Sequence, residues 1–365
     1  MKTSHATLIT ALCLAVTACS NSRGLTPAPP TASPTPFSVL AGLHTQTTIG
    51  STVDTGSGTG NGDQNPYGLA IAPSTSGKIT QGDLIICNFN NAANVQGTGT
   101  TIEGLHPTAG SAPYRIAQDM SLTGCDALTL DPKDNIYNAA YATNLDPIFS
   151  SSGTLITTNA NPVWSGPFGE IYSATSGTYG AASVFASNAN SGTIVRLDLN
   201  SSGALSAIDT IISGFTKNTG VPGSILGASG LTYNPSGDIL YVVDGGNNRL
   251  VAFSGVTTLA PNSITVSGTG FTGPSASAAR VVYSGSPLNA PVSAALLVNG
   301  NVVVGNTADN NMIEISPGGA VMDKLDVDTG AVGAIFGIVT SGTTPASQKI
   351  YFNDDNAATV VLISQ

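Results

Sequence analysis

Charged residues are scarce in this chain. They make up 9% of its 365 residues, against roughly 25% in an ordinary globular domain. So few Glu, Lys and Arg argue against long surface helices and coiled coils. The 11 Lys and Arg are outnumbered by 21 Asp and Glu, which gives a net charge of −10. Nucleic acids require a basic face on their partners, so this balance argues against nucleic-acid binding.

Long hydrophobic runs and histidines are lacking as well. No apolar run is long enough to cross a bilayer as a helix, so the sequence predicts no integral membrane segment. Only three histidines are present, and none lies in an HxxxH or HExxH pattern, which argues against a histidine-based metal site. The sequence also has no P-loop and no G-x-S-x-G motif, so it predicts no catalytic residues.

The first 18 residues have the features of an export signal. A basic start at Lys2 precedes a short apolar core, and small residues then lead to Cys19. The stretch Val16-Thr17-Ala18-Cys19 resembles the lipobox of bacterial lipoproteins. This resemblance implies that Cys19 becomes a lipidated N-terminus. The non-Asp residue Ser20 behind it implies an outer-membrane lipoprotein, facing either the periplasm or the surface. A simple cleaved signal is the alternative.

Three segments follow from this interpretation. Residues 20–36 are rich in Ser, Thr, Pro and Ala and lack apolar periodicity, which is typical of a disordered tether. We therefore divide the chain into a signal peptide (1–18), a lipidated cysteine with its tether (19–36) and a folded body (37–365).

The body is a series of short apolar runs separated by Gly, Asn, Asp, Ser and Pro, a pattern typical of short β-strands. One phrase recurs: a strand, a Gly-bearing turn, a second strand ending on Asn or Asp, and a third, alternating strand. The clearest copy covers residues 230–253, and the other five begin at Gly68, Ala127, Ile171, Ala294 and Ile335. Six copies average about 55 residues each, close to the length of propeller blades.

The fourth copy, with YVVDGGNNRL at residues 241–250, resembles the NHL repeats of six-bladed β-propellers. The resemblance implies an all-β, six-bladed propeller over nearly all of residues 37–365. Because the chain ends with the third strand of copy six, residues 37–42 are predicted to supply its fourth strand and close the ring. A seven-bladed ring and a β-sandwich are the alternatives.

Position within the blades indicates a candidate site. The loop that enters each first strand of a propeller lies at one mouth of the central channel. The residues expected there are Tyr67, Asp126, Glu170, Ser229, Val292 and Phe336. Asp126 and Glu170 are expected at equivalent positions of adjacent copies, where with Tyr67 they would form a ligand site. The two carboxylates could hold Ca²⁺, as the channel metal is held in gluconolactonase-like propellers; solvated carboxylates are the alternative.

Two further cysteines, Cys87 and Cys125, lie in the body. Export to an oxidising compartment would allow a disulfide between them. The alternative is a pair of buried free thiols, which behave as small apolar side chains.

These observations predict an exported, membrane-anchored propeller that acts as a non-catalytic binding or scaffold module. Its expected partner is a protein or an envelope glycan, because catalytic side chains are few. Two alternatives remain: a metal-dependent lactonase or lyase that uses Asp126 and Glu170, and a structural or adhesive component of a surface assembly.

Overall fold

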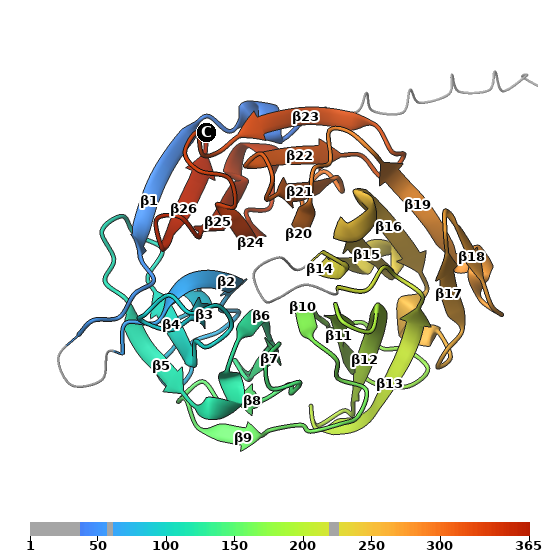
Figure 1. The fold of residues 1–365 in the computed structure, drawn as a ribbon, viewed down its shortest axis with the longest axis horizontal. Coiled ribbons are helices and arrows are strands. Elements are labelled where there is room, and N and C mark those ends of the chain that lie inside the picture. Colours follow the sequence, from blue (N-terminus) through green and yellow to red (C-terminus); the bar gives the residue numbers. More distant parts are fainter. Residues whose placement is uncertain (1–36, 57–60, 219–225) are drawn as a thin grey trace, which may run out of the picture. The chain divides into compact units, whose positions relative to one another are not determined.

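Six small sheets, antiparallel except for one parallel strand pair, lie around a central axis (Figure 1). The computed structural model describes residues 37–56, 61–218 and 226–365. The predicted six-bladed β-propeller is therefore confirmed. The predicted signal peptide, lipidated Cys19 and tether lie outside the described residues. Within the described ranges, no helix is long and apolar enough to cross a membrane.

Each of the first three blades has its first strand innermost. Blade 1 contains β2 (Gln64–Ile71), β3 (Leu84–Asn90), β4 (Thr101–Leu105) and β5 (Tyr114–Gln118). Blade 2 contains β6 (Cys125–Leu130), β7 (Ile136–Ala140), β8 (Ile148–Phe149) and β9 (Leu155–Thr157). Blade 3 contains β10 (Pro167–Ser173), β11 (Ala182–Asn188), β12 (Thr193–Leu199) and β13 (Leu205–Ser213).

The other three blades repeat the arrangement. Blade 4 contains β14 (Ala228–Asn234), β15 (Ile239–Asp244), β16 (Arg249–Ser254) and β19 (Ala279–Ser284). Blade 5 contains β20 (Pro291–Leu296), β21 (Val302–Asn306), β22 (Asn311–Ile315) and β23 (Val321–Asp326). Blade 6 contains β24 (Ile335–Ser341), β25 (Lys349–Asp354), β26 (Thr359–Ser364) and the N-terminal β1 (Thr45–Ser51).

The described helical segments are single 3₁₀ turns between strands. They are η1 (Leu40–Gly42), η2 (Met120–Leu122), η3 (Pro235–Gly237), η4 (Gly245–Asn247), η5 (Val256–Thr258), η6 (Ala276–Ala278) and η7 (Pro345–Ser347).

Blade 4 shows how the repeated phrase produces its turns. The side chain of Asn234 accepts a hydrogen bond from the backbone N–H of Ser236 at 3.0 Å, which caps η3. Asp238 and Asn248 both adopt φ of +48° at the ends of the two turns. Asp and Asn tolerate this left-handed backbone better than most residues, which explains why they recur between the strands.

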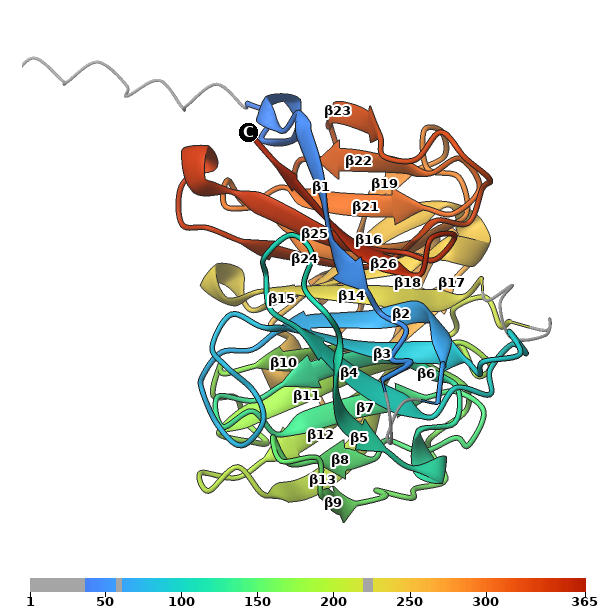
Figure 2. The ribbon, with the colours of Figure 1, turned by 90° about the vertical axis from the view of Figure 1, so that its left-hand side faces the viewer.

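The ring is closed by an N-terminal strand, as predicted, but a different segment supplies it. The strand β1 pairs antiparallel with β26, from Thr45 opposite Ser364 to Ser51 opposite Thr359, and runs along the edge of blade 6 (Figure 2). Residues 37–42, the predicted closing strand, instead contain the turn η1. The reason is their apolar side chains: Val39 and Leu40 are buried in the core between blades 5 and 6.

A buried carboxylate holds this N-terminal segment in place. Glu314 on β22 accepts hydrogen bonds from the hydroxyl of Ser38 at 2.7 Å and from the backbone N–H of Leu40 at 2.7 Å. It also accepts them from the side chains of Asn299 and Asn301. These donors outweigh burial and lower the pKa of Glu314, so the segment is bound to blade 5 as well as to blade 6.

A hairpin that belongs to blade 4 also contacts blade 3. Residues between β16 and β19 form a hairpin of β17 (Ile264–Ser267) and β18 (Gly270–Thr272). The strand β17 pairs parallel with β13, so a segment of blade 4 extends the sheet of blade 3. Buried side chains of both blades meet in one apolar cluster beneath it, among them Phe185 and Phe253.

Candidate functional site

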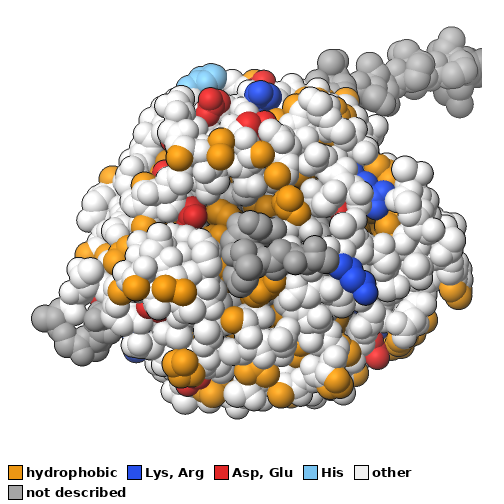
Figure 3. Space-filling model, viewed as in Figure 1, with side chains coloured by type: hydrophobic (Ala, Val, Ile, Leu, Met, Phe, Trp, Pro, Cys, Tyr) orange, Lys and Arg blue, Asp and Glu red, His pale blue; other side chains and the backbone are white. Residues whose placement is uncertain are grey.

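The inner strands of all six blades surround a cavity of about 70 Å³. Its lining comes from β2, β6, β10, β14, β20 and β24. Hydrophobic side chains are prominent around the centre of the face that Figure 3 shows. This cavity lies where the sequence predicts the mouth of the central channel.

Each inner strand begins with a β-bulge, which leaves one residue per blade without a partner on the neighbouring strand. In blade 2, Cys125 pairs with Ala140 and Ala127 pairs with Ala139, so Asp126 is the extra residue. Bulges re-aim side chains and are common beside functional sites. The same register places these residues at the bulges of blades 1 to 6: Tyr67, Asp126, Phe168, Ser229, Val292 and Phe336.

The predicted equivalence of Asp126 and Glu170 is therefore wrong. In blade 3, Pro167 pairs with Asn188 and Glu170 pairs with Ala186, so Phe168 occupies the position of Asp126. Glu170 lies two residues deeper, at the level of Leu128 in blade 2. The bulge is common to all six blades, so the error lies in the register assigned to the third copy, which is displaced by two residues.

Small residues form the next level of the channel. They are Gly68, Ala127, Gly169, Gly230, Ser293 and Gly337. A Cβ on Gly230 would lie 2.6 Å from the Cα of Ser293, and one on Gly337 would lie 2.6 Å from the carbonyl oxygen of Tyr67. Neighbouring inner strands approach so closely here that larger side chains would not fit.

Glu170 lies at the third level, where its five equivalents are apolar. They are Leu69, Leu128, Leu231, Ala294 and Ile338. All six line both the 70 Å³ cavity and a second cavity of about 330 Å³. The channel thus has two compartments, and Glu170 is the one ionisable side chain among these six residues at their boundary.

Burial of the carboxyl groups of Asp126 and Glu170 disfavours their ionised forms. Asp126 is 3% exposed, and neither of its carboxyl oxygens has a hydrogen-bond partner among the described residues. Burial raises the pKa of Asp126 well above its usual value. Glu170 is 7% exposed, and burial, then the nearby Asp146, raise its pKa. Like Asp126, Glu170 has no hydrogen-bond partner for either carboxyl oxygen among the described residues, although the nearby backbone N–H of Ala139 lowers its pKa in part. Asp126 receives no such compensation.

Aromatic rings form a collar around Asp126. Tyr67 stacks on Phe89 with ring centroids 4.3 Å apart and on Phe336 with centroids 3.7 Å apart. Phe89 meets the edge of Tyr141 at 6.5 Å. The apolar cluster at this mouth consists of Tyr67, Phe89, Tyr141, Phe168, Ala189 and Val292, with Phe336 packed against it. We call its five aromatic residues the aromatic collar.

Sequence reasoning places Tyr67 and Phe336 at the mouth but misses the other three rings of the collar. Phe89 and Tyr141 directly follow the ends of the hairpins, after Asn88 and Ala140. An aromatic residue next to that turn position was the available signal.

A disulfide lies directly beside Asp126. It joins Cys87 on β3 to Cys125 on β6, with their Cα atoms 5.8 Å apart. The bond links blade 1 to blade 2 at the residue before Asp126. The equivalents of Cys87 also reach the next blade: the hydroxyl of Ser187 donates to Ser229 O at 2.7 Å, and the amide of Asn353 donates to Gly68 O at 2.9 Å. At this position blade 1 is linked to the next blade by the disulfide, and blades 3 and 6 are each linked to the next blade by a hydrogen bond.

The asparagines at the ends of the second strands have structural partners. Each donates to a carbonyl oxygen in the segment that leads into its own blade: Asn88 to Thr52, Asn188 to Val163 and Asn306 to Pro287. These side chains brace the connections between blades, so they form no polar ring around the channel.

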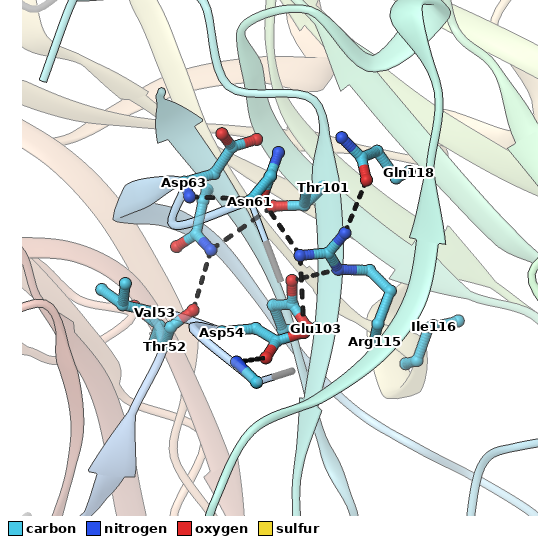
Figure 4. Close-up of polar contacts among 12 residues, drawn as sticks. Thr52, Val53, Asp54, Asn61, Asp63, Thr101, Glu103, Arg115, Ile116 and Gln118 are labelled. Atoms are coloured by element: carbon cyan, nitrogen blue, oxygen red, sulfur yellow. Dashed lines mark hydrogen bonds and ion pairs between the residues drawn. The ribbon is translucent and has the colours of Figure 1, made fainter. Parts of the chain in front are cut away.

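A polar network at blade 1 also braces a connection between blades (Figure 4). Arg115 donates to Glu103 at 2.5 Å and to Asn61 at 3.0 Å, and it lies 3.5 Å from Asp54. Burial raises the pKa of Glu103 to about 8, although Arg115 opposes the shift. The network connects the segment that leads from blade 6 to blade 1. Arg115 pairs with one carboxyl oxygen of Glu103, and the other oxygen is buried without a hydrogen-bond partner among the described residues.

The described residues do not fit a Ca²⁺ ion in the channel. Such an ion takes six to eight oxygen ligands. Nowhere in the described ranges do three or more His, Cys, Asp or Glu side chains gather in a way that could hold a metal. Asp126 and Glu170 lie at different levels, and the hydroxyl of Ser229 is directed to the carbonyl oxygen of Val243.

Comparison with solved structures identifies a shared fold. No protein-family model matches the chain, and no curated protein does. Virginiamycin B lyase from Staphylococcus aureus has a TM-score of 0.52 at 13% identity, over 88% of this chain and 99% of that one.

Two further structures are similar to a comparable degree. A putative gluconolactonase has a TM-score of 0.54 at 12% identity, over 90% and 93% of the two chains. The calcium-binding protein regucalcin from Agrobacterium tumefaciens has a TM-score of 0.53 at 13% identity, over 87% and 93%. At identities this low, the structural similarity establishes the propeller fold alone. The function has to be inferred from the candidate site.

Proposed function

We propose that this protein is an exported, ligand-binding propeller whose site is the 70 Å³ cavity around Asp126. The observation that carries the proposal is the carboxyl group of Asp126, which is buried inside the aromatic collar without a hydrogen-bond partner among the described residues. An unsatisfied buried polar group costs about 1–3 kcal/mol, and more when it is charged. Groups held at such a cost cluster at functional sites.

The size of the cavity limits what can enter. It admits a small molecule, or one protruding group of a protein or glycan. The expected role as a binding module is thereby narrowed to recognition of a small group at the channel mouth.

Export and anchoring remain part of the proposal. A disulfide between Cys87 and Cys125 is typical of proteins in oxidising compartments, which supports a location outside the cytoplasm. We place the protein at the outer membrane through a lipid on Cys19, in the periplasm or at the surface.

The binding site can be tested with a fragment library that contains cationic, neutral and anionic compounds. Ligand-observed NMR would compare the mature wild-type protein with Asp126→Asn, and with Asp326→Asn as a control at an exposed acid on β23. We expect fragments that compete for one site, lose affinity in Asp126→Asn and keep it in Asp326→Asn. A library without binders, or binders indifferent to Asp126→Asn, would refute the proposal.

A second candidate function is a lactonase or lyase. It is favoured by the two buried carboxyl groups in the channel and by the similarity in fold to proteins with those names. Hydrolysis of glucono-δ-lactone, measured with added Ca²⁺, Mn²⁺ or Zn²⁺ and with EDTA, separates the two functions. We expect no turnover above the spontaneous rate; turnover that Asp126→Asn abolishes would establish the enzyme.

A further inference from the structure

We propose that the group recognised in this cavity is a small organic cation, an ammonium group bearing methyl or short alkyl substituents, with Asp126 as its counter-ion inside the aromatic collar. This inference rests on the proposed ligand-binding function and specifies the chemical class of the ligand.

The charge of the cavity selects a cation. Asp126 and Glu170 both line it, whereas none of its described lining residues is Lys or Arg. Asp355, in the turn after β25, acts with Asp126 to raise the pKa of Tyr67, although burial of the phenol is the larger cause. Two acids thus act on the same ring at the mouth. An anionic ligand would find no basic side chain among the described lining residues, whereas a cation can be balanced when a carboxyl group ionises.

The walls of the cavity select an organic cation over a metal ion. A divalent metal needs several oxygen ligands, whereas Asp126 is flanked by rings. Its equivalents in the adjacent blades are Tyr67 on β2 and Phe168 on β10. Ring faces attract ammonium groups that carry methyl substituents, and such groups need few hydrogen bonds. One carboxylate within aromatic walls suits this chemistry.

The collar is preorganised for such a ligand. Tyr67 is enclosed between Phe89 and Phe336, at 4.3 Å and 3.7 Å, so both of its faces are already covered. The stack therefore holds Phe336 in place. Phe168 and Phe336 both line the cavity and are available to contact the ligand.

Binding should be coupled to proton release. In the free protein burial favours the protonated form of Asp126, whereas a cation requires the carboxylate. The affinity should rise about tenfold per pH unit until free Asp126 ionises. The other titratable groups near the site are Tyr67, Asp355 and Glu170. Burial keeps the phenol of Tyr67 protonated, and it also raises the pKa of Asp355 to about 7.

The experiment is an isothermal titration of the mature protein with choline and with 3,3-dimethylbutan-1-ol, which has the same shape without the charge. We expect choline to bind roughly tenfold or more tightly than the alcohol, and more tightly at pH 8 than at pH 6. N-acetyl-trimethyllysine methylamide, titrated in parallel, distinguishes a free cation from a modified lysine of a partner protein.

Three variants make the result specific. Asp126→Asn should abolish the preference for choline, Phe168→Leu should weaken choline several-fold, and Asp326→Asn should bind like the wild type. Circular dichroism melts establish that each variant is folded. Equal binding of choline and the alcohol would overturn the cation assignment and leave the ligand-binding function standing. If neither cation binds while neutral fragments do, the assignment also fails; if no fragment binds, both proposals fail.

Discussion

Asp126 is the residue on which the functional account depends. Its carboxyl group is 3% exposed and unpartnered among the described residues, and its position is set by a bulge and by the disulfide at its neighbour Cys125. A buried carboxyl group without a partner lowers the stability of the folded protein, and such groups are retained where function requires them. Replacing Asp126 should therefore raise the free energy of unfolding and abolish ligand binding.

The first prediction concerns the stability of Asp126→Asn. We expect urea denaturation at pH 7 to give a higher free energy of unfolding than for the wild type, by about 1.4 kcal/mol for each unit by which folding raises the pKa of Asp126 up to pH 7. An Asp whose pKa is raised on folding binds more protons when folded, so wild-type stability is lost as pH rises above its unfolded pKa of about 4. The advantage of Asp126→Asn should thus grow from pH 4 to pH 8. A variant less stable than the wild type at every pH would contradict this explanation.

Residue-level prediction from the sequence succeeds where the register of a copy is assigned correctly and fails in the third copy, where it is displaced by two residues. Tyr67, Asp126, Val292 and Phe336 line the cavity as expected. Glu170 also lines it, but at a deeper level than predicted, because Phe168 takes the bulge position. The ionisation of both acids depends on burial between blades, which no local pattern contains.

Among the elements, the ties between blades decide how firmly the site is held. The link from Cys87 on β3 to Cys125 on β6 closes a sequence separation of 38 residues. Hydrogen bonds from Ser187 and Asn353 serve the same purpose elsewhere in the ring. The site is most rigid where the tie is covalent.

The second prediction is that removal of this disulfide costs both stability and binding. Cys87→Ala with Cys125→Ala should lower the free energy of unfolding by about 3–4 kcal/mol, on the loop-entropy estimate. It should also weaken choline binding, because the backbone beside Asp126 is no longer fixed. Urea denaturation with and without dithiothreitol is the measurement: wild-type protein should respond to the reductant and the double variant should not. Equal stability of the two proteins would show that the bond is dispensable.

The third prediction concerns the closing strand. Glu314→Gln should loosen η1 and β1, because an amide cannot accept all the hydrogen bonds that Glu314 receives from Ser38, Leu40 and the asparagine side chains. Hydrogen exchange of the β1 amides should accelerate, while the amides of β11 in blade 3 serve as an internal control. Unchanged protection of β1 would show that its pairing with β26 suffices.

The sequence predicts the existence of this closing strand but not its location. The sixth copy of the repeat contains only three strands, so the sequence predicts that another segment supplies the fourth. The position of β1 instead depends on where Val39 and Leu40 find a core and on Glu314, which is more than 260 residues away in the chain. The same holds for the hairpin of β17 and β18, whose pairing with blade 3 is not encoded in the repeat.

At the scale of the whole molecule, the fold is the most predictable feature. Six copies of one phrase define six blades, and the ring follows from the need to pair every edge. The ring brings six bulge residues to one mouth, although they are far apart in the sequence. Function then depends on which side chains occupy those positions, and three of the six are aromatic while one is acidic.

The fourth prediction concerns metal dependence of the whole protein. Because no three His, Cys, Asp or Glu side chains gather among the described residues in a way that could hold a metal, thermal unfolding of the mature chain should be the same in millimolar Ca²⁺ and in EDTA. A ligand at about 100 times its Kd would add roughly 2.7 kcal/mol to the stability. A reproducible rise of the midpoint in Ca²⁺ would overturn this conclusion and favour the metal-dependent enzyme.

The most direct test of the central claim is a crystal structure of the mature protein grown with choline. We expect density for the ammonium group in the 70 Å³ cavity, against the carboxylate of Asp126 and the ring of Phe168. A cavity that holds only water, with choline absent or bound elsewhere, would contradict it.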